Sequence, residues 1–362
     1  MIYIVAPLIF VGLILFLVLV LMVFQLFFSG DQKTGIVVNE DKRLSAESGS
    51  TLLLALAEHG IFVPSACGGK GSCGLCKVEV PKGAGEPLPQ ELPYLSREER
   101  RKDVRLSCQV KVNGEIGVRL PDTLLNAKKY KAEVIMTRDL TYDIKELRFK
   151  LIDPTNIDFK AGSYIQLIVP EYYEEFRAYS ISNAETNKDQ VELMIRLVKN
   201  GLCSTYAHSL EKGDRVTFTG PYTDFELDEN ENTELILVGG GVGMAPIRSL
   251  ALSAVEKFKK KRISVYFGCR AVKDMIYYDE FKALSAKHQN FVAHYALSDL
   301  DPQDNWNGAT GFIHLTLDRC MTKTGPRQAF LCGPPLMINA VTKTLKANGL
   351  EDKDIFWDDF GV

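Results

Sequence analysis

Hydrophobic residues are distributed along this chain in four patterns, and each pattern predicts a different kind of structure. Residues 2–28 carry no charged side chain. As a helix they would span roughly 40 Å, against about 30 Å for the hydrocarbon core of a bilayer. We therefore expect residues 1–30 to hold a transmembrane helix. A signal peptide is the alternative, but it would need a basic start and small residues before a cleavage site, and neither is present.

Residues 33–124 combine short strand patterns with one apolar helix. Strands are expected at residues 36–38, 77–80, 107–112 and 117–120. Residues 51–57 predict a helix that ends near His59, and residues 94–102 predict a charged, solvated helix capped by Ser96. These elements are grouped into one small β-rich domain.

From residue 128 to about 228, short strand patterns follow one another with turn residues between them. They cover residues 132–136, 146–150, 164–169, 192–196 and 216–219. Strands of this length and spacing are typical of a closed antiparallel barrel.

Residues 229–362 alternate strand and helix patterns. Apolar strands are expected at residues 234–238, 263–267, 291–297 and 328–332. The helix after the first strand has apolar residues at helical spacing, namely Ile247, Leu250, Ala251, Ala254, Val255 and Phe258. Such alternation predicts a parallel sheet with a nucleotide at the carboxyl ends of its strands. The fold class is therefore multidomain, α+β and α/β.

The amino-acid composition limits which kinds of partner and metal site are expected. The 362 residues carry a formal net charge of −3, so a nucleic-acid partner is not expected. Cys203, Cys269, Cys320 and Cys332 are scattered, which fits buried thiols in a reducing compartment. The five histidines do not pair at metal-ligand spacing and are interpreted as structural or surface residues.

Four other cysteines carry the strongest chemical signal. Cys67, Cys73 and Cys76 form C-x₅-C-x₂-C in a glycine-rich loop, and Cys108 follows at a distance. This is close to the plant-type ferredoxin spacing, with a first gap that is one residue longer. Glycines let a loop wrap around sulfide with its amides directed inward. We predict a [2Fe–2S] centre, with a zinc site or disulfides as the alternatives.

Two glycine-containing turns follow predicted strands in the last third. Residues 239–246 (GGGVGMAP) differ from the G-x-G-x-x-G fingerprint, but small residues before a helix still let amides approach a pyrophosphate. Residues 332–335 (CGPP) also follow a strand and precede a helix. Together the turns favour a nucleotide site.

Residues 177–180 (RAYS) and 201–205 (GLCST) suit a second cofactor. An arginine can bind a diphosphate, a tyrosine can stack on a ring and a serine can donate to a flavin edge. An ordinary strand with a surface arginine and a core tyrosine is the alternative interpretation.

In this order, these four motifs resemble the ferredoxin–NADP⁺ reductase superfamily. With the cysteine loop and an apolar helix ahead of them, the chain is similar to the F subunits of sodium-translocating NADH:quinone oxidoreductases. Finer support comes from residues 268–270, 277–281, 296–306, 311–314 and 358–361. Residues 169–176 depart from the family, because its flavin domain normally carries a sizeable insertion there.

The resemblance implies FAD, NADH and a [2Fe–2S] cluster as cofactors, with Cys332, Ser180 and Phe360 as catalytic residues. The implied FAD contacts are Arg177, Ala178, Tyr179, Ser180, Gly201, Cys203, Ser204 and Thr205, with Phe360 covering the flavin. Arg196 is a further implied cofactor contact. The implied NADH contacts are Gly239, Gly240, Gly241, Val242, Gly243, Met244, Pro246, Cys269, Arg270, Cys332, Gly333 and Pro334. The cluster ligands would be Cys67, Cys73, Cys76 and Cys108. For Cys203 and Cys269, a packing role stays open.

The resemblance also implies a place in the cell and a set of partners. Hydride would pass from NADH to FAD and single electrons to the cluster, then to other membrane subunits and ultimately to quinone. We expect a single-pass protein of the cytoplasmic membrane with its redox domains in the cytoplasm. The alternatives are the reductase component of a multicomponent oxygenase and a membrane-tethered electron carrier with a vestigial flavin site. NADPH in place of NADH also stays open.

Overall fold

The protein is described here by a computed structural model that covers residues 2–28, 33–170, 172–223, 227–301 and 303–360. At residues 2–9, 24–28, 33, 122–123 and 172–174 only the backbone is described. By their internal contacts the residues form two compact units, one of residues 1–63 and 69–125 and the other of residues 64–68 and 126–362.

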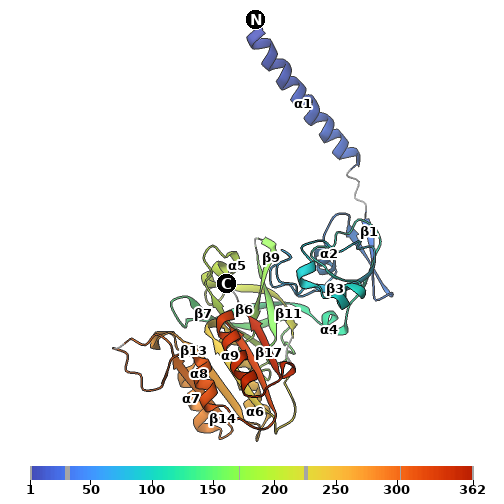
Figure 1. Cartoon of the computed structure of the whole chain (residues 1–362). Coiled ribbons are helices and arrows are strands. Elements are labelled where there is room, and N and C mark those ends of the chain that lie inside the picture. Colours follow the sequence, from blue (N-terminus) through green and yellow to red (C-terminus); the bar gives the residue numbers. More distant parts are fainter. Residues whose placement is uncertain (1, 29–32, 171, 224–226, 302, 361–362) are drawn as a thin grey trace. The chain divides into compact units, whose positions relative to one another are not determined.

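The chain begins with helix α1, Ile2–Phe28 (Figure 1). Its large hydrophobic side chains between Phe10 and Val23 are exposed. Within the described residues, no helix meets the length and hydropathy needed to cross a bilayer. The transmembrane helix expected from the sequence therefore stays a prediction.

The remainder of the first unit is built on a mixed five-stranded sheet in the order β2-β1-β5-β3-β4. Its elements are β1 (Lys33–Val38), β2 (Lys42–Glu47), α2 (Leu52–Glu58), β3 (Lys77–Lys82), α3 (Arg97–Arg101), β4 (Val104–Leu106), β5 (Ile116–Arg119) and α4 (Asp122–Leu125). Both predicted helices are confirmed, although α3 is shorter than the predicted residues 94–102. The predicted Ser96 cap is also confirmed, since Ser96 forms a capping box with Glu99. Thr51 caps α2, because its side chain accepts a hydrogen bond from the Leu54 amide.

The strand predicted over residues 107–112 is wrong. Strand β4 ends at Leu106, and the residues that follow form a turn next to the start of α2. There the carbonyl groups of Ser107 and Val110 accept the amides of Leu53 and Leu52, so they satisfy the helix N-terminus and are not available for a sheet ladder.

The second unit begins with an antiparallel six-stranded sheet in the order β10-β7-β6-β11-β8-β9. The strands are β6 (Lys128–Asp139), β7 (Ile144–Asp153), β8 (Tyr164–Val169), β9 (Tyr172–Ser180), β10 (Gln190–Arg196) and β11 (Arg215–Tyr222). A single bridge between Ile181 and Leu193 links the two edges of the sheet. The predicted antiparallel architecture is confirmed. The barrel closes only at the Ile181–Leu193 bridge.

A parallel six-stranded sheet with the order β15-β14-β13-β12-β16-β17 completes the unit. Its strands are β12 (Glu234–Gly240), β13 (Ile263–Cys269), β14 (Phe291–Leu297), β15 (Ala309–Thr310), β16 (Arg327–Gly333) and β17 (Ile355–Asp359). The helices are α5 (Leu202–Ser209), which packs on the antiparallel sheet, and α6 (Met244–Lys257), α7 (Tyr278–Lys287), α8 (Ile313–Cys320) and α9 (Pro335–Ala347). The parallel sheet expected from the sequence is confirmed.

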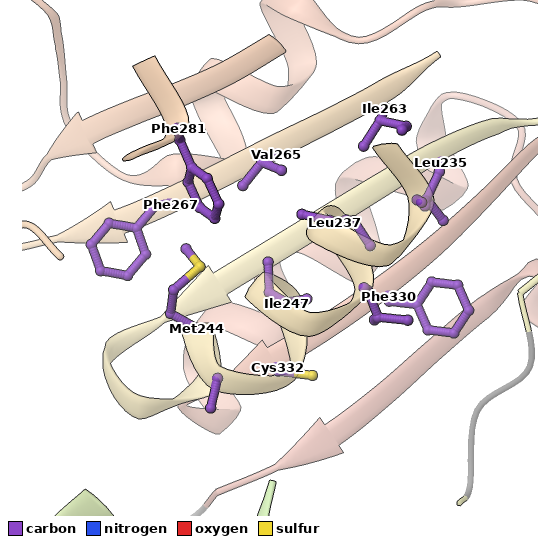
Figure 2. Close-up of a cluster of buried hydrophobic side chains, with 14 of the residues drawn as sticks. Leu235, Leu237, Met244, Ile247, Ile263, Val265, Phe267, Phe281, Phe330 and Cys332 are labelled. Atoms are coloured by element: carbon purple, nitrogen blue, oxygen red, sulfur yellow. The ribbon is translucent and has the colours of Figure 1, made fainter. Parts of the chain in front are cut away.

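Alternate residues of these strands enter two separate cores. Leu235 and Leu237 lie in a cluster with α6 and Phe281 of α7, shown in Figure 2. Ile236 and Val238 lie in a second cluster with α8 and α9. The apolar residues predicted on α6 are all buried. A sheet buried on both faces leaves its strand ends as the place for a ligand.

Candidate functional site

The cysteine loop brings thiols together without bonding them. The sulfurs of Cys76 and Cys108 lie 3.3 Å apart, both cysteines are buried, and neither forms a disulfide. The hydrogen bond that the Cys76 thiol donates to the Cys108 sulfur, together with burial, raises the pKa of Cys76 far above its ordinary value, and the nearby Cys73 adds to the effect. Two thiolates this close repel each other, so a cation between them would remove that cost. Cys67 lies earlier in the loop, with its sulfur 3.9 Å from Ser65 Oγ.

In the described residues, no three His, Cys, Asp or Glu side chains converge as ligands for one metal ion. A [2Fe–2S] cluster divides its four sulfur ligands between two irons. The Cys76–Cys108 pair would supply the two sulfur ligands of one iron in such a cluster.

The residues around the loop hold Cys108 in place. Glu91 and Arg105 form a buried ion pair with an Nη2–Oε2 distance of 2.6 Å, and Glu91 Oε1 accepts the Leu106 amide at 2.9 Å. The hydrogen bond from Arg105 and those from two amides lower the pKa of Glu91, although burial alone would raise it. The carboxylate thereby fixes the backbone two residues before Cys108.

The turn between β12 and α6 is packed against the end of β16. A Cβ added to Gly243 would meet the Cys332 carbonyl group and lie 2.7 Å from Gly333 N. Gly241 has φ +57, and a Cβ there would lie 2.6 Å from Arg196 Nη2. Since β12 and β16 are where the strand order reverses, this turn lies at the topological switch point of the sheet. Pro246, where the helix was expected to begin, is the third residue of α6.

A cavity of about 1220 Å³ opens at the carboxyl ends of β12, β13, β14 and β16. Its wall includes Gly240, Gly241, Cys269, Arg270, Pro334 and Arg196 from the predicted site. The volume exceeds the roughly 300–1,000 Å³ of ordinary small-molecule pockets, which suits an extended ligand such as a dinucleotide. The glycine cradle and the helix that follows it fit a pyrophosphate.

Acidic residues that the sequence interpretation missed line the same cavity. They are Asp143, Asp274, Asp299, Asp301 and Asp304. Asp143 pairs with Arg196 at 3.1 Å. The three from Asp299 to Asp304 follow strand β14, so the rule that ligands bind at carboxyl strand ends could have found them.

Burial raises the pKa of Cys269 to about 12, which keeps this thiol protonated.

The cavity also exposes apolar surface. Phe312 is 66% exposed and Leu336 is 84% exposed, and both belong to the wall. Exposed apolar side chains at a pocket are suited to the face of a ring system.

The second cluster of predicted cofactor residues lies on β9 and at the start of α5. Arg177 Nη1 donates to the Phe176 carbonyl at 2.7 Å and pairs with Glu175 at 3.1 Å. Tyr179 is partly buried, and burial raises its pKa. Ala178 is partly buried and Ser180 is 9% exposed.

Gly201 is the N-cap of α5, which packs against β8, β9 and β10. A Cβ at Gly201 would lie 2.6 Å from Ser204 Oγ. That hydroxyl accepts the Val198 amide at 3.1 Å and donates to the Gly201 carbonyl. Cys203 is buried and Thr205 is exposed. Ser204 therefore braces the turn, whereas the first amides of α5 and the donors of β9 form the set that fits a diphosphate.

Cys332 is completely buried in the core beneath α6, where Figure 2 shows it with Met244 and Ile247. It is not part of the cavity wall. Burial, with the charge of Asp358, raises the pKa of the thiol, so the sulfur keeps its proton. The predicted contact with the nicotinamide stays a prediction. Phe360 is partly buried, and its amide donates to the Gly333 carbonyl at 3.4 Å.

A buried ion network joins the two sheets of the second unit. Arg248 on α6 donates to Glu192 on β10 at 2.7 Å and pairs through two nitrogens with Glu280 on α7 at 2.7 and 2.8 Å. The ring of Tyr277 lies 4.5 Å from its guanidinium, and the Tyr277 hydroxyl donates to Glu146 on β7 at 2.8 Å. Sequence reasoning missed this network, although an arginine within an apolar helix is the signal for it.

Comparison with known proteins identifies three domain families along the chain. Family models match residues 36–113 (2Fe-2S iron-sulfur cluster binding domain), 131–227 (oxidoreductase FAD-binding domain) and 237–343 (oxidoreductase NAD-binding domain). The F subunit of the Na(+)-translocating NADH-quinone reductase of Serratia proteamaculans is 36% identical, over 97% of this chain and 98% of that protein. Its counterpart in Actinobacillus pleuropneumoniae is 39% identical, over 97% and 98%.

Solved structures agree at the level of the fold. The Amycolatopsis cytochrome P450 reductase GcoB has a TM-score of 0.72 and 28% identity, over 91% of this chain and 99% of that chain. The ferredoxin reductase in carbazole 1,9a-dioxygenase has a TM-score of 0.69 at 23% identity, over 91% and 98%, which shows the fold alone.

Proposed function

Because this chain belongs to the family of F subunits of Na(+)-translocating NADH-quinone reductases, we propose that it oxidises NADH and sends the electrons towards quinone. The family models supply the three cofactor domains that this reaction needs, for FAD, NAD and a [2Fe–2S] cluster. The chain is therefore an NADH oxidoreductase that acts as one component of a larger complex. The observation that carries the proposal is the cavity at the switch point of the parallel sheet.

The cavity is the proposed NADH site. The amides of the turn at residues 239–244 would bind the pyrophosphate, assisted by the positive end of the α6 dipole. Arg196 lies next to Gly241 and would add a cationic contact. Phe312 offers a ring face at the cavity wall.

The carboxylates of the cavity support NADH over NADPH. A 2′-phosphate needs cationic contacts. Arg270 and Lys273 are present in the wall, but so are four carboxylates, Asp274, Asp299, Asp301 and Asp304. The added phosphate would bring negative charge next to these carboxylates, whereas the ribose hydroxyl of NADH could donate to one of them.

FAD is assigned to the residues of β9 and the start of α5, and the cluster to the cysteine loop. When bound, FAD accepts hydride and releases single electrons, and the cluster carries single electrons. The chain positions these groups: Arg177 and the Gly201 turn would hold the diphosphate, and Tyr179 and Ser180 would contact the flavin. Cys67, Cys73, Cys76 and Cys108 would bind iron. Phe360 would cover the flavin ring when no nicotinamide occupies the site.

We also propose that α1 anchors the protein in the cytoplasmic membrane, with the redox domains in the cytoplasm. Residues 2–28 carry no charged side chain, and those described are exposed. NADH is a cytoplasmic substrate, so its site would face the cytoplasm. The partners would then be the membrane subunits of the complex. Fractionation of cells that express the full chain tests this; recovery in the soluble fraction after gentle lysis would contradict it.

The reductase component of an oxygenase is the second candidate. It is favoured by the likeness to the Amycolatopsis cytochrome P450 reductase over 91% of this chain. The partners that co-purify with the full chain in mild detergent separate the two functions. Membrane subunits would support the respiratory complex, and an oxygenase would support the second candidate.

Activity is tested with the full chain in mild detergent, loaded with FAD and reconstituted with iron and sulfide. We expect ferricyanide reduction that depends on NADH and is much slower with NADPH. If the loaded protein does not turn over with either nucleotide, the proposed function is wrong. A vestigial flavin site would be revealed by failure to retain FAD.

A further inference from the structure

The side chain of Gln109 makes a contact in the cysteine loop that the proposed function does not use. Its Nε2 donates a hydrogen bond to the sulfur of Cys108 at 3.2 Å. Gln109 is partly buried and Cys108 is 5% exposed, so the bond is partly shielded from water. A hydrogen bond in such surroundings is stronger electrostatically than one in bulk solvent.

Two neighbours fix the orientation of this amide. Gln90 donates from its Nε2 to Gln109 Oε1, so the oxygen of Gln109 is occupied and its nitrogen is directed at the sulfur. On the other side Gly71 has φ +75, and a Cβ there would lie 2.6 Å from Gln109 Nε2. The loop thus leaves room for the amide where a larger residue at position 71 would displace it.

Hydrogen bonds to cluster sulfurs are one of the factors that set the reduction potential of an iron–sulfur centre. One-electron reduction adds one negative charge to the cluster and its thiolates, and no bond is formed or broken. A donor that faces a ligand sulfur stabilises the more negative state more than the less negative one, so it raises the potential.

From this geometry we propose that Gln109, oriented by Gln90, tunes the cluster to a higher reduction potential. The inference rests on the proposed function, because it requires the cluster to be bound at these cysteines. Gln109 is a positioning and tuning residue, since it acts on the iron through Cys108. The higher potential makes the cluster a better acceptor for the electrons that come from NADH.

The test is redox titration of the full chain in detergent, with mediators and with the cluster followed by EPR. In Gln109→Met, which keeps the length of the side chain but removes the donor, we expect the equilibrium constant for reduction to fall about three- to tenfold. At 59 mV per tenfold for a one-electron couple this is a drop of about 30–60 mV. Gln109→Glu should lower the potential further, because a carboxylate replaces the donor.

Gln90→Leu should lower the potential by less than Gln109→Met, because the donor is present but no longer oriented. Gln90 is exposed, so this variant decides the question if Gln109→Met does not retain iron and sulfide. Asn113→Leu, an exposed amide in the same segment, is the matched control and should leave the potential unchanged.

A purely structural role for Gln109 predicts loss of cluster without this order of potentials. If the loaded Gln109 and Gln90 variants titrate at the potential of the parent protein, the inference is overturned while the proposed function stands. If the parent protein itself shows no [2Fe–2S] signal after reconstitution, the proposed function fails at its cluster.

Discussion

Removing the Arg248 guanidinium should destabilise the NAD-binding region far more than removing an exposed cation from the same helix. The Arg248 side chain is 9% exposed and that of Glu192 is 6% exposed, so Arg248→Met removes a buried partner of this carboxylate and leaves it paired with Arg148 at 2.8 Å. Breaking a buried pair in this way costs about 3–5 kcal/mol. Lys257→Met is the matched control, because Lys257 lies on the same helix as Arg248 and pairs with Glu229, but is 40% exposed. An exposed pair contributes about 0–1 kcal/mol.

Urea unfolding followed by tryptophan fluorescence measures this difference. Trp306 and Trp357 are the two tryptophans of the sequence, and both lie in the NAD-binding region, so the signal reports that region and not the ferredoxin domain. With an m-value of about 2 kcal/mol per molar urea, the midpoint for Arg248→Met should fall by about 1.5–2.5 M. The midpoint for Lys257→Met should fall by less than about 0.5 M.

A double variant separates a charge effect from a packing effect. In Arg248→Met with Glu192→Met, the buried carboxylate is removed together with its buried cationic partner, and Arg148 on β7 can be solvated because it is 33% exposed. We expect the double variant to be about 1–3 kcal/mol more stable than the sum of the two single losses. If the two losses simply add, or if Arg248→Met costs no more than Lys257→Met, the ion network does not hold the two sheets together.

Three further predictions concern the nucleotide turn, the cluster and the pH dependence of stability. Gly243→Ala would force a Cβ into the backbone of Cys332 and Gly333, and displacement of the turn should raise KM for NADH about tenfold, a loss of about 1.4 kcal/mol, with FAD content unchanged. Gly114→Ala is its control, because no atom lies within 4 Å of the added Cβ; equal KM values in the two variants would refute the account. Cys108→Ser should abolish the [2Fe–2S] EPR signal and quinone reduction while NADH-dependent ferricyanide reduction persists, and an intact signal would exclude Cys108 as a ligand. Burial and then repulsion from Arg262 lower the pKa of His294 from its ordinary value of 6.5. On acidification the unfolded chain therefore binds a proton at His294 before the folded chain does. The contribution of the neutral His294 to the free energy of unfolding is present above about pH 6.5 and is lost as pH falls towards the folded pKa. His294→Phe keeps the stacking on Tyr266 and should reduce the difference between urea midpoints at about pH 7.5 and about pH 5.5; an unchanged difference would assign the acid sensitivity to other groups.

Much of the fold was predictable because its signals are local. The strand patterns of the last third correspond to β12, β13, β14 and β16, and the apolar spacing after Pro246 predicted the buried face of α6. The failure at residues 107–112 has a non-local cause, since that segment gives its carbonyl groups to α2, which lies more than fifty residues earlier in the chain. Strand β9 was only an alternative interpretation of residues 177–180, because its charged and aromatic residues do not alternate.

The candidate site likewise has features with local sequence signals and features that depend on non-local contacts. The cysteine spacing and the glycine turns are contiguous motifs, so the sequence by itself determined which cofactors this chain accommodates and in which order their domains follow. Only the tertiary structure decided which single side chains are in contact. Cys332 lies in the core and not in the cavity wall. Arg248 pairs with Glu192, which is 56 residues earlier in the chain, and Gln90 orients the Gln109 amide towards the sulfur of Cys108. Hydrophobic periodicity and backbone geometry act over a few neighbouring residues, whereas burial and electrostatic pairing depend on groups that become neighbours only when the chain has folded.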